Sequence, residues 1–585
     1  MADLDPAVKA ALERTKQGRV EHEGRLRRFD HAYDVYNASP SRVGVEPWQS
    51  KLRVKWAKQT IDTATVNIVS GVPRCQVRPR QPGGELPAKA MQHIMDYYVG
   101  EDHLVEKQPV IAQQGLIYGI TPAKIHWLYS TTKRPTKRFT RNPFDQSQPL
   151  EITDIDEQIV VVRDGPTLEP WSPYHVYWEP GARDVDSAAY VVLQTYLSKE
   201  DLRKLKFNPD TGIGIYHNVD DLISRGPIGQ SHQTSQDRAL GNNERFKDKY
   251  LIEEFWTDDT LVVIGNRQVL LRAQDNPYWH GKKPIVIAQT SPDLYEMVGS
   301  SETELIDHIQ QAAWTLQNMT MDNLHLTVMR GITYREGGVT DPSQLELRPR
   351  FKWPVSDHDD IRPFEVQPIS SDVFTERQRL MGDMQQVTGI NSYVTGAGDT
   401  AGVDQNTATG ITALQEVASR LLRFKAAQIQ YKVYQRNFEQ WGDLIQQFMD
   451  KSIPVKLMGP GNEGQWVEIS PSMVAGHFNY DLEGTEESLS KQQERGEAIA
   501  LLNAFAPLVP TGMVNIKPLL EKVATAYNFP NPEALVAPAQ PAQPPAAPVA
   551  GQLPQQPTGG TNVQALLGGQ TLDPRIQNAI TNGSR

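Results

Sequence analysis

The most constraining feature of the sequence is the stretch from Ser301 to Arg330, which contains neither glycine nor proline. Ser301 and Glu304 have the spacing of a capping box, so a helix is predicted to begin there. At 1.5 Å per residue this helix would be about 45 Å long. One narrow stripe of it is apolar and keeps helical spacing: Leu305, Ile309, Leu316 and Met319. A long helix with one thin stripe is hard to bury in a single chain and is typical of a rod packed sideways against neighbours.

The segments that follow predict that this helix is one arm of a hairpin. Residues 331–370 contain strand-like pieces and tight turns, and residues 371–388 predict a second polar helix. The chain would run out along one helix, form a small knob, and return along the other. A stretch rich in Gly, Thr and Asp occupies 389–410, and its glycines permit the backbone states that a moving loop needs. Residues 411–450 then predict a second long rod helix.

The chain before the hairpin predicts a mixed body of helices and strands. Residues 5–38, 46–70 and 86–119 carry helical patterns. After Gly119 the period changes to short runs of β-branched and aromatic residues separated by turn residues, which is typical of strands. The segment 206–249 is polar and has little periodicity, so we expect a long surface excursion.

The chain after the rod predicts fewer elements. Strands are expected within 453–482, and helices near 486–506 and 516–528. Residues 530–560 are rich in Pro, Ala and Gln, cannot bury a core, and are expected to be disordered or extended. The predicted fold class is therefore α+β.

Composition limits the function. The chain of 585 residues carries 59 Lys and Arg against 70 Asp and Glu, a net charge of −11. This balance is unlike that of a protein that grips nucleic acid through many phosphate contacts, but it suits one past which a polyanion must slide. No apolar run is long enough for a transmembrane helix, so membrane insertion is not expected. The one cysteine, Cys75, excludes an internal disulfide and predicts a buried thiol in a strand.

The sequence contains no recognisable catalytic motif. The Gly281-Lys282 pair lacks the glycine that a Walker A loop requires, and neither H-E-x-x-H nor G-x-S-x-G occurs. The stretch "GAGDTAG" from Gly396 to Gly402 follows a helix where a dinucleotide loop needs a strand. No catalytic residue and no cofactor is therefore predicted.

Two charged clusters allow more than one interpretation. "SDHDD", from Ser356 to Asp360, could suggest a metal site, but its spacing matches no metal loop and favours a solvated turn. "KRPTKRFTR", from Lys133 to Arg141, could be a nucleic-acid patch, but an exposed hairpin tip is the favoured interpretation. No metal is predicted.

Five segments, in order along residues 46–530, resemble those of one family, the portal proteins of tailed bacteriophages, most closely those of short-tailed phages. "VNIVSGVP" resembles the first wing helix and its exit, and "QQGLIYGITPAKIHW" resembles a helix–Gly–strand unit. "PWSPYHVYWEPGARDVDSAAYVV" resembles a third segment, with Glu179 where the family commonly has Asp. "VGSSETELIDHIQQAAWTLQNMTMDNL" is similar to the start of the stem, with Gly299, Gln310 or Gln311, and Asn318 matching. "TGINSYVTGAGDTAGVDQNTATGI" resembles the tunnel loop.

The resemblance implies a portal fold with an α/β wing, a helical stem, a small α/β clip, a long rod helix and a helical crown. The implied boundaries are a wing at 46–298, stem helices at 299–330 and 371–388, a clip at 331–370, a tunnel loop at 389–410, the rod helix and wing strands at 411–483, and a crown at 484–530. The resemblance does not cover the N-terminal helical extension at 1–45, the C-terminal tail at 531–585 or the excursion at 206–249.

The implied function is structural rather than enzymatic. Portal subunits form a ring, usually dodecameric, at one capsid vertex of the virion, and double-stranded DNA enters and leaves through it. The ring would assemble in the host cytoplasm and contact the major capsid protein or scaffold. The large terminase supplies the motor and docks on the clip, and tail adaptor proteins replace it later. The absence of a Walker motif agrees with this division of labour.

Three sets of site residues follow from the resemblance. Stem acids repeated around the ring would form an acidic channel wall that repels phosphates: Glu302, Asp307 and Asp322. The tunnel loop would follow the DNA: Thr395, Gly396, Gly398, Asp399, Gly402, Asp404 and Gln405. A charged clip face would contact partners, or instead form salt bridges between subunits: Arg348, Arg350, Lys352, Asp357, Asp359 and Asp360.

Two other classes of function stay open at this point. Another virion structural protein, either a capsid protein or an internal ejection protein, is the closer alternative. A metal-dependent nucleic-acid enzyme is the more distant one, because its carboxylates would have to converge in a pocket, whereas those here lie on helix faces and in turns.

Overall fold

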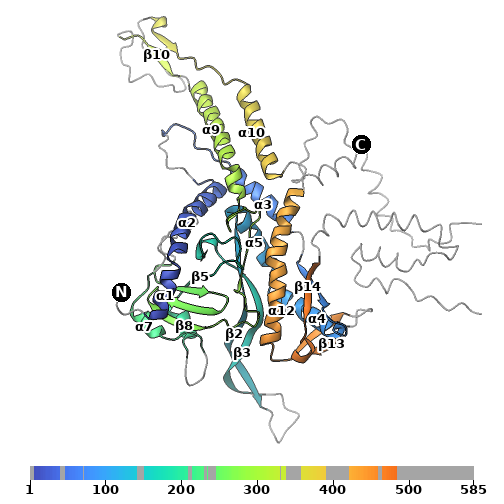
Figure 1. The fold of residues 1–585 in the computed structure, drawn as a ribbon. Coiled ribbons are helices and arrows are strands. Elements are labelled where there is room, and N and C mark those ends of the chain that lie inside the picture. Colours follow the sequence, from blue (N-terminus) through green and yellow to red (C-terminus); the bar gives the residue numbers. More distant parts are fainter. Residues whose placement is uncertain are drawn as a thin grey trace, which may run out of the picture. The chain divides into compact units, whose positions relative to one another are not determined.

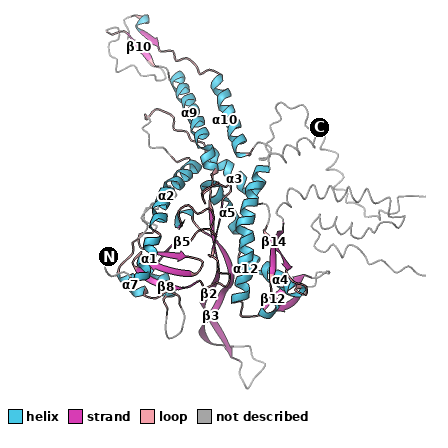
Figure 2. Cartoon of the chain, viewed as in Figure 1, coloured by secondary structure: helices cyan, strands magenta, loops and turns pink. Residues whose placement is uncertain are grey.

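The computed structural model mixes helices and strands in one chain (Figures 1 and 2). It describes residues 5–39, 46–69, 72–140, 151–207, 214–228, 234, 246–329, 331–336, 357–390, 420–458 and 464–483. The chain divides into two compact units, Met1–Pro532 and Glu533–Arg585, and every described residue belongs to the first. The predicted crown and C-terminal tail lie outside the described residues.

The N-terminal helices form as predicted. Helix α1 (Pro6–Arg14) starts at Asp5, whose side chain accepts a hydrogen bond from the Ala7 N–H, and Pro6 suits the first helical position. Helix α2 (Lys16–Asn37) buries Phe29, which is 1% exposed, in the main core. Residues 5–38 therefore build the body of the protein and are not a detached extension.

Helices α3 (Trp56–Ile68), α4 (Glu85–Glu101) and α5 (Leu104–Tyr118) follow, with strand β1 (Arg74–Pro79) between the first two. Helix α5 ends at Gly119, as predicted, with φ +74°, a backbone conformation that favours glycine. A Cβ at this position would also collide with the carbonyl oxygen of Gly299. The prediction of helix from residue 46 is wrong, because residues 46–55 are not helical.

Two larger antiparallel sheets supply most of the strands of the body. One has the order β4-β5-β6-β7-β8, formed by Val176–Trp178, Val191–Leu197, Tyr250–Trp256, Thr260–Gly265 and Val269–Asp275. The other has the order β3-β2-β9, formed by Glu151–Pro170, Thr121–Thr140 and Ile285–Ala288. The strand prediction is confirmed. The basic run lies largely in β2 of the long β2–β3 hairpin, as the hairpin interpretation expects, but residues 141–150 lie outside the described residues.

The predicted surface excursion contains more structure than expected. After helix α6 (Lys199–Leu205), helix α7 (Val219–Ser224) buries Val219 and Leu222, which are 1% and 0% exposed. Leu222 packs against Gly265 of β7, where a side chain on the glycine would clash with it. Two apolar residues three positions apart were enough to anchor this short helix to the sheet.

The predicted hairpin of helices is present. Helix α9 (Glu302–Val328) begins with the full Ser301–Glu304 capping box, and α10 (Asp372–Thr388) returns beside it (Figure 1). Between them, β10 (Ile332–Tyr334) pairs antiparallel with β11 (Ile361–Pro363), directly after a 3-10 turn at His358–Asp360.

The rod is helical from residue 420 to Phe448, but not uniformly. Residues 420–429 are α-helical, Gln430–Gln435 form a π-helical turn, and α12 (Arg436–Phe448) continues. Trp441, at 0% exposed, anchors α12 in the core. The π turn is a departure from the predicted plain helix.

The last described strands close the body. Strands β12 (Ile453–Met458) and β13 (Gly464–Ile469) pair with each other, and β14 (Phe478–Glu483) pairs with β1. In that pair Cys75 lies opposite Leu482 and is 2% exposed, so the buried thiol in a strand is confirmed. Within the described residues, no helix is long and apolar enough to cross a membrane.

Candidate functional site

The root of the stem contains a buried ion pair. Glu302 occupies the first turn of α9, and Lys425 projects from the rod helix; their side chains are 0% and 2% exposed and bond to each other. Burial raises the pKa of Glu302, and the ammonium of Lys425 opposes that rise. The expectation that Glu302 faces an open channel is corrected, because the rod covers it within the same chain.

Asp307 is also turned inward. It is 7% exposed, lies 2.9 Å from His31 Nε2 on α2, and accepts a hydrogen bond of 2.7 Å from Gln311 Nε2. The sequence does not show that α2 covers this part of α9. Asp307 therefore cannot contribute an exposed charge to a channel wall in this chain.

Asp322 belongs to a different arrangement, a ladder of side chains along α9 that holds an extended segment. Its carboxylate accepts a hydrogen bond of 2.6 Å from the Ser50 N–H. Asn318 accepts one from the Leu52 N–H at 2.9 Å and donates one to the Leu52 carbonyl at 3.1 Å. Trp314 Nε1 donates to the Val54 carbonyl at 2.9 Å. We call residues 46–55 the strap.

The ladder works because two spacings match. Four residues of a helix rise about 6 Å, and two residues of an extended chain rise about 6.6 Å. Polar groups at every fourth position of α9 therefore meet alternate residues of an antiparallel strap. Below the strap, Gln310 continues the series by accepting from the Ala57 N–H at 2.8 Å and donating to the Val35 carbonyl at 3.1 Å.

The sequence carries a signal for this ladder. Gln310, Trp314, Asn318 and Asp322 stand four residues apart, and each can serve a backbone group. Asn318, and either Gln310 or Gln311, are also matching positions in the resemblance to portal stems. Their role here is to bind the strap and the end of α2, and Asp322 is a strap ligand rather than a free channel charge.

The stem root is fixed to the body from several directions. Thr303 Oγ1 donates to the Ile117 carbonyl at 2.9 Å, and Gly299 N–H donates to the Gly119 carbonyl at 3.1 Å. Arg28 of α2 pairs with Glu304 at 2.5 Å. The first turn of α9 thus cannot tilt without disturbing α2 and α5.

Further along the hairpin, α9 and α10 leave apolar side chains uncovered. The exposed members are Met319, Leu324, Leu326, Val328 and Met329 on and after α9, and Phe374 and Val387 on α10. Inward residues such as Ile306 and Met384 pack with one another. A two-helix hairpin that still exposes this much apolar surface is suited to lateral contact with other copies.

The clip residues divide into three groups. Asp357 and Asp359 are exposed, as partner contact would require. Asp360 is 4% exposed, pairs with Arg335 at 3.3 Å and accepts a hydrogen bond from the Asp357 N–H at 2.9 Å, so its expected availability to a partner is corrected. Arg348, Arg350 and Lys352 lie outside the described residues.

The tunnel-loop residues from Thr395 to Gln405 also lie outside the described residues. What is described is the chain on either side of them. Helix α10 ends at Gly389, whose φ is +73°, and the rod is described from residue 420. Five residues further on, Lys425 makes the buried pair with Glu302.

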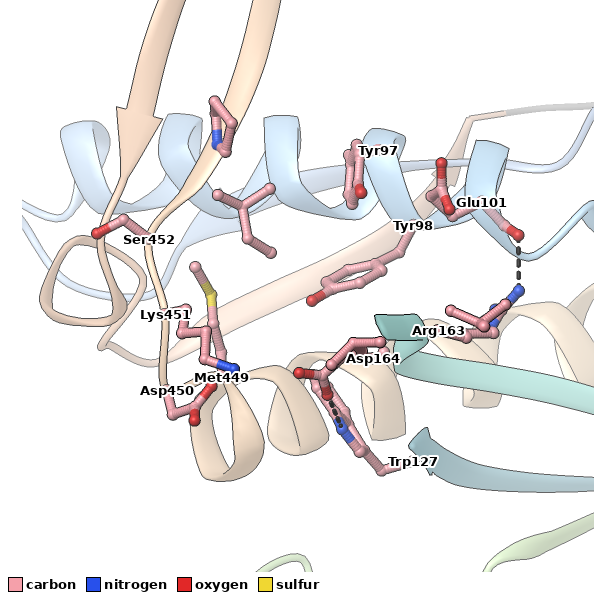
Figure 3. A pocket seen from close by; sticks show the side chains of 15 residues that line it. Tyr97, Tyr98, Glu101, Trp127, Arg163, Asp164, Met449, Asp450, Lys451 and Ser452 are labelled. Carbon is pink, nitrogen blue, oxygen red and sulfur yellow. Dashed lines mark hydrogen bonds between the residues drawn. The ribbon is translucent and has the colours of Figure 1, made fainter. Parts of the chain in front are cut away.

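The body has a cleft of about 310 Å³ between α4, the β2–β3 hairpin and the start of β12, with Tyr97, Tyr98 and Trp127 on its walls (Figure 3). Several of its polar groups already bond to one another: Trp127 Nε1 donates to Asp164 at 2.9 Å, and Arg163 donates to the Glu101 carbonyl at 2.6 Å. No nucleophile paired with a base is present among the residues that line it.

One buried ion pair of the body joins strands of its two larger sheets. Lys124 bonds to both carboxylate oxygens of Glu254, at 2.9 and 2.7 Å. Burial lowers the pKa of nearby His126 to about 3, so this imidazole is neutral. Over the described part of the chain, no group of three or more His, Cys, Asp and Glu side chains could hold a metal ion.

Comparison with known protein families identifies the family of the chain. The model of a family described as phage SU10 portal protein matches residues 76–565, well over half of the chain. The chain belongs to the phage SU10 portal protein family. This membership makes it a phage portal protein, a component of the virion that forms a ring at the capsid vertex and passes DNA during packaging and ejection. The alternatives of a capsid protein, an ejection protein and a nucleic-acid enzyme are set aside.

The matched range starts after the strap. Residues 5–38, the strap and α3 precede residue 76, although α2 and α3 pack in the main core. This portal protein therefore includes N-terminal elements beyond the family match, and they hold the stem that the family match contains.

Proposed function

We propose that copies of this chain form a dodecameric ring in the host cytoplasm, whose bore carries double-stranded DNA into the capsid and later out of it. The observation that carries the proposal is the α9–α10 hairpin. It is fixed to the body at one end, carries the β10–β11 knob at the other, and exposes apolar side chains that one chain does not cover.

The subunit is proposed to have the wing, stem, clip, rod and crown boundaries expected from the sequence. The knob between α9 and α10 corresponds to the clip, which would dock the large terminase during packaging and tail adaptor proteins afterwards. The wing would contact the major capsid protein or the scaffold. The chain itself would perform no enzymatic step, because the terminase supplies the motor.

The acidic stem wall is not retained in this proposal. Glu302 and Asp307 are buried, and Asp322 binds the strap. Weak adhesion of the DNA would depend instead on the net charge of −11 and on the loop at 389–410, which we propose hangs into the bore.

Deletion of residues 396–403 tests the bore assignment. We expect rings of normal size by electron microscopy, together with reduced DNA packaging or poor retention of the packaged genome. A matched deletion within the tail, such as residues 541–548, serves as a control for loss of chain length. Normal packaging and retention after removal of 396–403 would argue against a loop that acts on the DNA.

A further inference from the structure

The strap presents one kind of side chain to its own subunit and another to solvent. Arg53 donates to the Ser39 carbonyl at 2.7 Å and stacks over Trp314, and Lys55 donates to Asn37 Oδ1 at 2.7 Å. The alternate residues Leu52 and Val54 are 44% and 39% exposed, and Trp48, in the turn at the start of the strap, is 52% exposed. In an extended chain alternate side chains share a face, so the strap has an uncovered apolar face.

The backbone that carries this face is already ordered in the single subunit. The backbone of Ser50, Leu52 and Val54 is bound by α9 side chains, so the strap does not have to be ordered on association. An exposed tryptophan on a rigid backbone is typical of an interface anchor, because little conformational entropy is lost when it is buried.

The geometry of a ring indicates which surface of a neighbouring copy the strap contacts. A cyclic ring uses head-to-tail contacts, in which one patch of each copy meets a different patch of the next. The two patches must be on different flanks of the subunit. The strap lies along the α9 face formed by Trp314, Asn318 and Asp322, whereas α10 packs near Ile306 and Ile309 through Met381 and Met384. On α10, Phe374 is 54% exposed.

The heights of these patches agree. In the proposed ring the stems surround the bore, and rotation about an axis parallel to them keeps each residue at the same height along that axis. Leu52 is level with Asn318, and Trp48 precedes Ser50, which is bound to Asp322. The start of α10 is at the same level, because Asn323 donates to the Gln367 carbonyl at 3.1 Å, just before α10 begins at Asp372. Phe374 therefore lies at the height of the strap.

We propose that the strap is an intersubunit clasp, whose Trp48, Leu52 and Val54 pack against the first turns of α10, around Phe374, on the neighbouring copy in the ring. The inference rests on the proposed ring and adds the contact that joins one stem to the next. The strap also precedes the matched family range, so the clasp is a feature of this chain's N-terminal region.

Engineered cysteines test the clasp directly, since the single native cysteine is buried. Two single variants, Leu52→Cys and Phe374→Cys, are produced with different tags, mixed during assembly and oxidised. Disulfide-linked dimers that carry both tags are expected, with at most trace amounts when either variant assembles alone. The double variant Leu52→Cys/Phe374→Cys should produce a series of disulfide-linked oligomers. If it produced only monomers with internal crosslinks, the proposal would be overturned.

Truncation of the apolar face provides a second readout. Trp48→Ala/Leu52→Ala should raise the protomer concentration needed for half-assembly by roughly tenfold or more, while the circular dichroism spectrum of the protomer is unchanged. Trp279→Ala is the matched control, because Trp279 is 72% exposed elsewhere on the body, and it should leave assembly unaffected. Rings that form normally without crosslinks would refute the clasp alone, whereas an unaltered chain that never forms rings would refute the proposed function.

Discussion

Replacement of Lys425 by methionine should loosen the root of the stem. The change leaves the Glu302 carboxylate, 0% exposed, without its partner, and its Oε2 atom has no hydrogen-bond partner even in the intact protein. Removing one member of a buried pair typically costs about 3–5 kcal/mol. Glu302 can avoid part of this cost by binding a proton, so we expect about 3 kcal/mol.

Hydrogen exchange of the backbone amides measures this effect locally. A loss of 3 kcal/mol corresponds to roughly 150-fold faster exchange at the start of α9 and in residues 420–429, because each 1.4 kcal/mol is a factor of about ten. The double variant Glu302→Met/Lys425→Met removes both charges at similar volume and should return exchange to within about tenfold of the native rate.

The effect should depend on pH in a defined direction. Burial raises the pKa of Glu302, so the folded state binds the proton more tightly than the unfolded state, and its stability falls as pH rises through the folded-state pKa. Without Lys425 the pKa rises further, so exchange in Lys425→Met should be slower at pH 5 than at pH 8 after correction for the intrinsic rate. A variant that exchanges like the native protein at both pH values would refute the assignment of a buried charged pair.

Three further predictions concern the strap, the stem root and the clip. Asn318→Ala removes two hydrogen bonds to Leu52 and should speed tryptic cleavage after Lys51 and Arg53 by roughly tenfold. Thr315→Ala is the control, and cleavage of Asn318→Ala at the rate of this control would mean that the ladder does not hold the strap. Gly119→Ala combines a positive φ with a clash against Gly299 and should lower the free energy of unfolding by about 2–3 kcal/mol, measured as a lower melting temperature. Gly83→Ala, with φ +87° and open space around it, should lower that free energy by only about 1 kcal/mol. Arg348→Glu/Arg350→Glu should weaken capture of the large terminase or a tail adaptor by preformed rings; loss of the rings themselves would instead assign these residues to salt bridges between subunits.

Local signals predicted the elements of this protein well. The capping box at Ser301 and Glu304 and the glycine at the end of α5 are short-range features, and both boundaries are found where expected. The hairpin strands and the buried Cys75 also follow from period and composition. These features depend on neighbouring residues, which a sequence displays directly.

Contacts between distant segments could not be predicted in the same way. The resemblance predicts that Glu302 and Asp307 line a channel, but the rod covers Glu302 with Lys425, and α2 covers Asp307 with His31. Leu52 and Asn318 are 266 positions apart, and nothing local to either shows that they bond. Periodicity indicates which face of a helix is polar but not what lies against it.

The π turn at Gln430–Gln435 shows a second limit. A π turn holds one more residue than the same length of α-helix, and no residue type in this stretch marks the insertion. Lys425 before the turn and Trp441 after it are both buried, so the turn joins two segments that are each packed in the protein.

Cryo-electron microscopy of the purified full-length chain tests the central claim most directly. We predict closed rings with a central hole, in which the α9–α10 hairpins surround the bore and each strap lies between adjacent stems. Particles that remain single subunits at every protein concentration and ionic strength would contradict the account.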